Sequence, residues 1–86
     1  MKVAFSKTFV KRFKKAPKKV QRAFRKRLEL FLDNPYHPIL NNHPLVGELK
    51  GYRSINVTGD WRAIFRVLDD GVVYFDTLGT HSQLYG

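Results

Sequence analysis

A few histidine, aspartate and arginine side chains in the second half of the chain could together do acid–base chemistry. His81 stands close to the C-terminus, and Asp60, Arg53 and Arg62 lie on the two segments before it. Histidine, with an ordinary pKa of about 6.5, can donate or accept a proton near neutral pH. The planar guanidinium of arginine matches two phosphate oxygens. This set is what RNA cleavage without a metal requires: a base for the 2′-hydroxyl, a donor for the leaving 5′-oxygen, and cations for the phosphorane.

Each candidate also has a plainer explanation. His81 could be a hydrogen-bonded surface histidine, and His43, between Asn42 and Pro44, could be an ordinary loop residue. Asp60 could cap the turn after Gly59. Arg53 and Arg62 could pair with aspartates across a sheet and stabilise it little. Tyr85 and Trp61 could stack on unpaired bases, or be aromatic residues of the core or its rim.

Several other chemistries have no support in the sequence. There is no phosphate-binding glycine loop and no G-x-S-x-G motif, and the chain has no cysteine. His37 and His43 are six residues apart without an acid at metal-ligand spacing. The acids are too scattered to indicate a two-metal nuclease. We therefore expect neither a metal nor another cofactor.

The first half of the chain predicts a short strand and two helices that would support such a site. Residues 2–5, KVAF, suit a strand, and Ser6 can cap a helix that ends before Pro17. From Pro17 to about Asp33, apolar residues recur at helical spacing. They are Val20, Ala23, Phe24, Leu28, Phe31 and Leu32. The opposite side of this second helix is basic, so one face should be buried and the other exposed.

After a proline-rich connection over residues 34–47, the period changes from helical to alternating. The alternation predicts strands over 48–57, 61–68 and 72–78. It places Leu49, Arg53, Ile55 and Val57 on one face of the first of these. The turns at 58–59 and 69–71 are so short that the three strands must be antiparallel. The expected fold class is α+β, in the order β-α-α-β-β-β, with two basic helices on one face of a small antiparallel sheet.

Positive charge is concentrated at the N-terminal end. Of the sixteen Lys and Arg residues, twelve lie within residues 1–30, where there is a single acid, and the whole chain has a net charge of +9. Such a block attracts a polyanion, most often nucleic acid, or an acidic protein. The alternative is a merely solvated helix face.

Length and composition predict one packed domain over residues 1–86. The 43% of apolar residues, with seven Phe, four Tyr and one Trp, can supply a core. No apolar run is long enough for a membrane span or a signal peptide. We therefore expect a cytoplasmic protein that does not bind membranes.

Residues 43–86 carry four short motifs: HPLxG at 43–47, KGYR at 50–53, DW at 60–61 and GTHxxLYG at 79–86. With them the chain resembles the RelE/ParE superfamily of toxins from type II toxin–antitoxin systems, and within it the YafQ-like branch of ribosome-dependent mRNA endoribonucleases. Over residues 1–42 it is similar only in pattern. The resemblance implies a RelE-like fold, a metal-independent nuclease, and three partners: the ribosome, mRNA and a cognate antitoxin.

The resemblance also implies roles for individual residues. His81 matches the general acid of the branch, Asp60 and His43 match two further active-site positions, and Tyr85 falls where the branch carries an aromatic residue. Arg62 matches an arginine that contacts the scissile phosphate in RelE. Other candidates for substrate binding are Arg53, Lys50 and Trp61. The helix residues that would grip ribosomal RNA are Lys18, Lys19, Arg22, Arg25 and Lys26.

One position departs from the pattern. The YafQ pattern has a second histidine on the strand that here reads SINV, and this chain has Asn56 there. Asparagine cannot exchange a proton, so a base at this site would have to be Asp60, His43 or another group.

Three functions follow from these observations. The first is a nuclease that cleaves ribosome-bound mRNA by attack of the 2′-hydroxyl, giving a 2′,3′-cyclic phosphate; it needs the tail tied to the sheet, with His81 and Tyr85 on the open face near Arg53 and Arg62. The second is a ParE-like inhibitor of DNA gyrase, which needs no such cluster. The third is a nucleic-acid-binding module that uses the basic helices alone.

Overall fold

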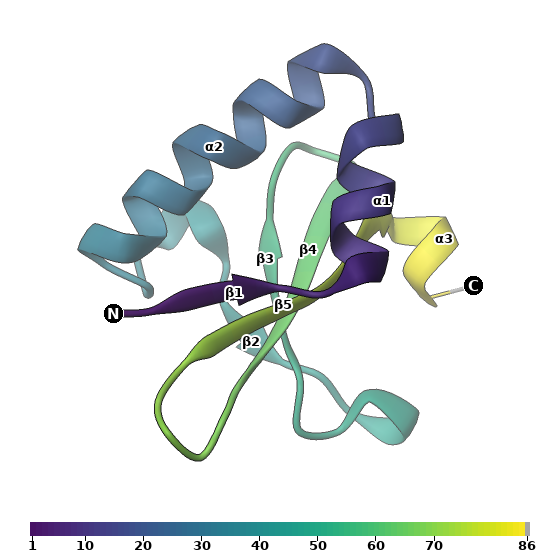
Figure 1. Cartoon of the computed structure of the whole chain (residues 1–86). Helices are drawn as coiled ribbons and strands as arrows, with labels where there is room; N and C mark the ends of the chain where they lie inside the picture. The colour runs from purple at the N-terminus through teal and green to yellow at the C-terminus, as the bar shows by residue number, and fades with distance from the viewer. Residues whose placement is uncertain (86) are drawn as a thin grey trace.

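The computed structural model describes residues 1–85 as two helices packed on a sheet, followed by a short C-terminal helix (Figure 1). The strands are β1 (Val3–Phe5), β2 (His43–Pro44), β3 (Arg53–Asn56), β4 (Trp61–Val67) and β5 (Val73–Thr80). The helices are α1 (Lys7–Lys15), α2 (Lys18–Asp33) and α3 (His81–Tyr85), with 3₁₀ turns η1 (Pro38–Leu40) and η2 (Gly47–Leu49).

The sheet is mixed, whereas the sequence predicted an antiparallel one. Its order is β1-β5-β4-β3-β2, and β1 pairs with β5 in parallel, Val3 opposite Val73. The other pairings are antiparallel. The short-turn argument applied only to β3, β4 and β5, and it is confirmed there. No short turn joins β1 to β5, because α1, α2 and the other three strands lie between them in the chain, and a connection of that length permits parallel pairing.

The strand predicted over residues 48–57 is shorter in the structure, where β3 covers only Arg53–Asn56. Gly47 and Gly51 have φ values of +68° and +97°, in the left-handed region that favours glycine, so the chain turns through η2 instead of extending. A short strand not foreseen from the sequence, β2, pairs with β3 at the sheet edge.

The helix cap predicted at Ser6 is confirmed. Oγ of Ser6 accepts a hydrogen bond of 2.9 Å from the amide of Phe9 and donates one of 2.6 Å to the carbonyl of Asp76 in β5. This serine therefore caps α1 and also fixes it to the sheet. Pro17 separates the two helices, as the N-cap residue of α2 rather than its first helical residue.

The core lies between the helices and one face of the sheet. α1 and α2 contribute Phe9, Val20, Phe24 and Phe31, and the strands contribute Ile55, Ala63, Phe65, Phe75 and Leu78. Edge-to-face and tilted contacts join the phenylalanines at centroid distances such as 5.1 Å for Phe9–Phe24 and 5.5 Å for Phe24–Phe75. Within residues 1–85, no helix is long and apolar enough to cross a membrane.

The opposite face of the sheet is not covered by α1 or α2. Because side chains alternate along a strand, Ile55 and Ala63 point to the helices, while Ser54 and Arg62 point the other way. This second surface is called the open face below. It carries three cross-strand rows, and the middle one consists of His43, Ser54, Ile64 and Thr77.

Candidate active site

The C-terminal segment is held against the sheet, as expected from the sequence. The amide of His81 donates a hydrogen bond of 2.9 Å to the carbonyl of Asp60, the residue before β4. Gln83 donates its amide to Oγ1 of Thr80 at 3.2 Å, and Thr80 donates its own to Oε1 of Gln83 at 2.9 Å. This reciprocal pair is a capping box, and it sets the direction of α3 at the end of β5 (Figure 1).

α3 places an imidazole and a phenol side by side near the open face. His81 and Tyr85 are four residues apart, so they share one side of the helix, and their ring centroids are 4.8 Å apart in an edge-to-face contact. The Tyr85 hydroxyl donates a hydrogen bond of 3.0 Å to Oγ of Ser54, whose side chain is 0% exposed. Since Ser54 belongs to β3 and α3 follows β5, the Tyr85 side chain crosses over β4.

His43 belongs to the same row of the open face. It pairs directly with Ser54 across β2 and β3, and paired residues on one face have their Cβ atoms about 5 Å apart. Its Nδ1 lies 2.7 Å from the carbonyl of Asn41. A carbonyl only accepts, so Nδ1 carries the proton, and in the neutral ring Nε2 is then the bare nitrogen. That is the form that a general base needs.

Asp60 is next to the C-terminal segment through its backbone, not through its carboxylate. Its carbonyl accepts from the His81 amide, while its side chain is exposed at the end of the β3–β4 turn. Within residues 1–85 the carboxylate accepts no hydrogen bond. Asp60 is therefore close to His81 in the fold and open to solvent.

The guanidinium of Arg62 is anchored at the β3–β4 turn. Its Nη1 donates to the carbonyls of Thr58 at 3.0 Å, Trp61 at 3.1 Å and Gly59 at 3.3 Å. These bonds engage only one of its nitrogens, and arginine has five N–H donors. Arg62 occupies the open face, in the same row as Asn56 and Gly79. It can offer a phosphate its remaining donors.

The expected convergence of Arg53 with His81 is wrong in this structure. Arg53 alternates with Ser54 along β3, so the two side chains leave opposite faces of the strand. Its Nε donates a hydrogen bond of 2.7 Å to Oδ1 of Asn42, and its Cζ lies 5.7 Å from the ring centre of Tyr36. Arg53 thus supports the 34–47 connection, away from the side chains that meet on the open face.

Two further substrate-binding candidates also lie apart from this cluster. Trp61 packs against the core on the helix side of the sheet, so its ring is not available for stacking next to Tyr85. Lys50 is exposed in the turn after η2, before β3 begins. It lies beyond the end of β3 nearer Arg53 and, within residues 1–85, contacts none of the groups around His81.

The basic side chains of α2 form a separate surface. All five candidates for ribosomal RNA binding, Lys18, Lys19, Arg22, Arg25 and Lys26, are exposed. They stand on the helix layer, on the other side of the sheet from the open face. The molecule therefore presents positive charge on one side and the histidine–tyrosine cluster on the other.

Sequence reasoning missed Arg12, which reaches the C-terminal segment from α1. Its Nη1 donates a hydrogen bond of 3.3 Å to the carbonyl of Leu78. A Cβ added at Gly79 would lie 3.0 Å from this Nη1 and from Oε1 of Gln83, and 3.2 Å from Cδ2 of Leu84. Glycine in the GTH motif therefore lets an arginine and α3 pack against β5. Nothing in the spacing of Arg12 distinguishes it from the other basic residues of α1.

Asn56 carries an unusual polar group. Its Oδ1 is enclosed and has no hydrogen-bond partner among residues 1–85, although such an oxygen ordinarily finds one. Asn56 pairs with Arg62 across β3 and β4. An acceptor thus lies buried beside one of the cations of the open face.

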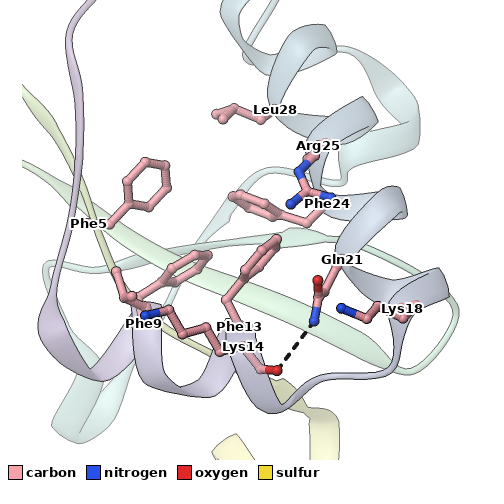
Figure 2. Close-up of a pocket in the computed structure, with 10 residues that line it drawn as sticks. Phe5, Phe9, Phe13, Lys14, Lys18, Gln21, Phe24, Arg25 and Leu28 are labelled. Carbon is pink, nitrogen blue, oxygen red and sulfur yellow. Dashed lines mark hydrogen bonds between the residues drawn. The ribbon is translucent and has the colours of Figure 1, made fainter.

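An apolar groove separates α1 from α2 on the outer side of the helix layer. It has a volume of about 470 Å³ and is lined by Phe5, Phe9, Val10, Phe13, Phe24 and Leu28. Figure 2 shows Lys14, Lys18 and Arg25 around these rings, with Gln21 donating to the carbonyl of Lys14.

In the described chain, no three His, Asp or Glu side chains gather as metal ligands do.

Comparison with known proteins identifies relatives over the whole chain. Residues 1–86 match the family model described as the bacterial toxin of the type II toxin–antitoxin system, YafQ. The curated mRNA interferase toxin YafQ of Escherichia coli K12 is 38% identical over 61 residues. That alignment covers 69% of this chain and 65% of the relative, so it spans slightly less than two thirds of the relative's length.

Solved structures extend the likeness to nearly the full length. The crystal structure of YafQ from E. coli BL21(DE3) superposes with a TM-score of 0.82 at 31% identity, covering 98% of this chain and 97% of that one. The toxin in the E. coli DinJ–YafQ toxin–antitoxin complex gives a TM-score of 0.74 at 34% identity, covering 98% and 96%. The family model, the curated relative and these solved structures therefore all point to the same family, the YafQ toxins.

Proposed function

Because the chain belongs to the YafQ family of toxins from bacterial type II toxin–antitoxin systems, we propose that it is an mRNA interferase, an endoribonuclease that cuts messenger RNA. The curated relatives carry that activity in their names. The observation that supports it in this chain is the hydrogen bond from Tyr85 to Ser54. That bond ties α3 across the sheet, and His81 in contact with Tyr85 becomes a fixed group at the open face.

The proposed reaction uses His81 as the general acid. The 2′-oxygen of the message attacks the adjacent phosphorus, the bond from phosphorus to the 5′-oxygen breaks, and a protonated His81 gives its proton to that oxygen. The products are a 2′,3′-cyclic phosphate and a 5′-hydroxyl. The free donors of Arg62 would stabilise the charge that develops on the phosphate.

His43 is the base that the geometry favours. Its Nδ1 is committed to Asn41, so Nε2 can take the proton of the 2′-hydroxyl. Asp60 is the second candidate for the base, because its backbone carbonyl accepts a hydrogen bond from the amide of His81 and so keeps the two residues close together. Loss of cleavage in His43→Ala with activity kept in Asp60→Asn would assign the base to His43. The reverse result would assign it to Asp60.

The exposed basic side chains of α2 would bind ribosomal RNA. They lie on the layer opposite the open face, so the protein can bind a ribosome on one side and present His81 to the message on the other.

The separation of the basic helix surface from the fixed His81 also favours a nuclease over the two alternatives. A gyrase inhibitor and a module that only binds nucleic acid would have no use for the fixed His81 and Tyr85. A protein acting on translated messages would work in the cytoplasm.

The cognate partner would be an antitoxin, as in the E. coli DinJ–YafQ complex. The groove between α1 and α2 offers an apolar floor and a basic rim, which suits an apolar segment flanked by acids. Val10 is 40% exposed in this groove. Val10→Glu should weaken antitoxin binding while the cleavage of messages stays unchanged. Unchanged antitoxin affinity would exclude the groove as the docking site.

Primer extension on a translated message tests the function itself. The wild-type chain should produce new 5′ ends within the reading frame, and His81→Ala should abolish them while remaining folded. Ser82→Ala is the matched control, since Ser82 lies exposed on the same helix. Cleavage that persists in a folded His81→Ala protein, or DNA damage without cleavage, would refute the proposal.

A further inference from the structure

The open face carries a second cluster beyond the candidate active site. The guanidinium of Arg66 on β4 lies between two tyrosine rings, with its Cζ 5.7 Å from the ring centre of Tyr52 and 5.5 Å from that of Tyr74. Arg66 is exposed and both tyrosines are half-buried. Within residues 1–85, no carboxylate pairs with Arg66.

The pairing of the strands puts these three residues in one row. Arg66 is directly opposite Tyr74. Arg53 is opposite Phe65, so the residue before Arg53, which is Tyr52, extends the row on the other side of Arg66. Along β4, Arg66 and Arg62 lie on either side of Ile64 on the open face. Arg66 is two residues along β4 from Ile64, which corresponds to about 7 Å. The row of Tyr52, Arg66 and Tyr74 is therefore the neighbour of the row that contains His43 and Ser54.

The cluster is suited to a ligand that combines an anionic group with an aromatic ring. Two aromatic faces attract the cation and hold its plane, and the edge of the guanidinium then presents its N–H donors as a fixed fork. Holding it in advance reduces the side-chain entropy lost on binding. A single exposed arginine without these rings would have no such order.

We propose that Tyr52, Arg66 and Tyr74 form a subsite for a nucleotide of single-stranded RNA that neighbours the cleaved bond. Arg66 would hold a phosphate, and a base would stack on the ring of Tyr52 or Tyr74. The inference rests on the proposed function, because it takes the message as the strand that crosses the open face. The RNA backbone would then follow β4 from Arg62 to Arg66.

Charge and continuity identify RNA as the occupant. The three rows place two cations, Arg62 and Arg66, on the open face with His43 in the row between them, and no acid of residues 1–85 is paired into any row, since Asp76 stands at the irregularity between Phe75 and Thr77. The rows pass without interruption from the cation at Arg62, through the His43 row, to Arg66. An acidic peptide would match the charge but would gain little from aromatic faces next to the cation.

Binding of a short single-stranded RNA to protein carrying His81→Ala tests the subsite without cleavage. Fluorescence anisotropy over a range of salt concentrations gives the affinity and its salt dependence. Arg66→Gln should weaken binding at least about fivefold. It should also lower the slope of log affinity against log salt by about 0.7, the value for one lost phosphate contact on a single strand. Lys11→Gln, which removes an exposed charge from α1, is the matched control.

Two tyrosine variants separate stacking from folding. Tyr74→Phe keeps the ring and should bind RNA as before, whereas Tyr74→Leu should lose several-fold in affinity. If Arg66→Gln changes binding no more than Lys11→Gln does, or if both Tyr74 variants behave alike, the subsite does not exist.

Cleavage of ribosome-bound message by the chain with His81 intact distinguishes failure of the subsite from failure of the function. Arg66→Gln should raise KM several-fold with kcat unchanged, because it removes a binding contact distant from the reacting atoms. A wild-type chain that never cleaves, while Arg66→Gln still weakens RNA binding, would refute the nuclease and leave the subsite standing. Normal KM and normal RNA affinity in an active Arg66→Gln enzyme would overturn the subsite alone.

Discussion

The hydrogen bond from Tyr85 to Ser54 makes a quantitative prediction about how α3 is held. Tyr85→Phe removes one hydroxyl and keeps the ring that contacts His81. The Tyr85 side chain is 36% exposed, but Ser54 is 0% exposed and cannot turn to water when its partner is lost. A buried group left without its partner costs about 1–3 kcal/mol. We take the lower end, about 1 kcal/mol, because the group left without its donor is an uncharged hydroxyl oxygen.

A loss of about 1 kcal/mol lowers the equilibrium constant for docking of α3 roughly fivefold. Cleavage by Tyr85→Phe should therefore fall by up to about fivefold, because His81 is held at the open face less often. Hydrogen exchange at the His81 amide, which is bonded to Asp60, reports the same equilibrium and should speed up by the same factor. Ser54→Ala should have a smaller effect, since the exposed Tyr85 hydroxyl can bind water. The double variant completes the cycle.

Two outcomes would contradict this reasoning. If Tyr85→Phe lost activity a thousandfold while exchange at the His81 amide stayed unchanged, the hydroxyl would act on the substrate and not as a positioning group. If neither activity nor exchange changed, the bond to Ser54 would contribute nothing to the position of α3. A circular dichroism spectrum identical to that of the wild type is the control for folding.

Three further predictions concern the cap, the arginines and the packing of α3. Ser6→Ala removes the α1 cap and the bond to Asp76, so it should lower the free energy of unfolding by about 1–2 kcal/mol. Calorimetry should then show a Tm lower by roughly 4–16 °C. An unchanged Tm would exclude the cap as a stabilising contact. Arg62→Gln should slow cleavage at least about tenfold, whereas Arg53→Gln should keep kcat within about twofold; equal losses in single-turnover assays would contradict the assignment of faces. Gly79→Ala puts a Cβ 3.0 Å from Nη1 of Arg12 and from Oε1 of Gln83. It should therefore destabilise the protein by about 1 kcal/mol and reduce cleavage. An unchanged midpoint of urea unfolding would show that these two side chains move away without cost.

Local signals in the sequence identified most of the elements. Ser6, Pro17 and the apolar spacing along α2 act within one or two turns of chain, so the helix boundaries could be predicted to within a few residues. The short turns fixed β3, β4 and β5 as antiparallel neighbours. The alternation also placed Arg53 with Ile55, and the structure keeps it there. The predicted convergence of Arg53 with His81 was wrong because the same alternation puts Arg53 and Arg62 on opposite faces of the sheet.

Other features depend on contacts between segments far apart in the chain. The parallel pairing of β1, the short strand at His43 and the reach of Arg12 to Leu78 leave no local pattern. Tyr52, Arg66 and Tyr74 stand as single residues on three segments, and only the register of the sheet brings them into one row.

For this protein, then, the sequence by itself determined the elements, the charge and the residue types available for chemistry. The tertiary structure decided which of those residues meet. The physical reason is range: capping, propensity and periodicity act between near neighbours, whereas strand register is set by packing and backbone hydrogen bonds over the whole sheet. The bond between Tyr85 and Ser54 joins residues 31 positions apart, and it is this bond that holds His81 at the open face.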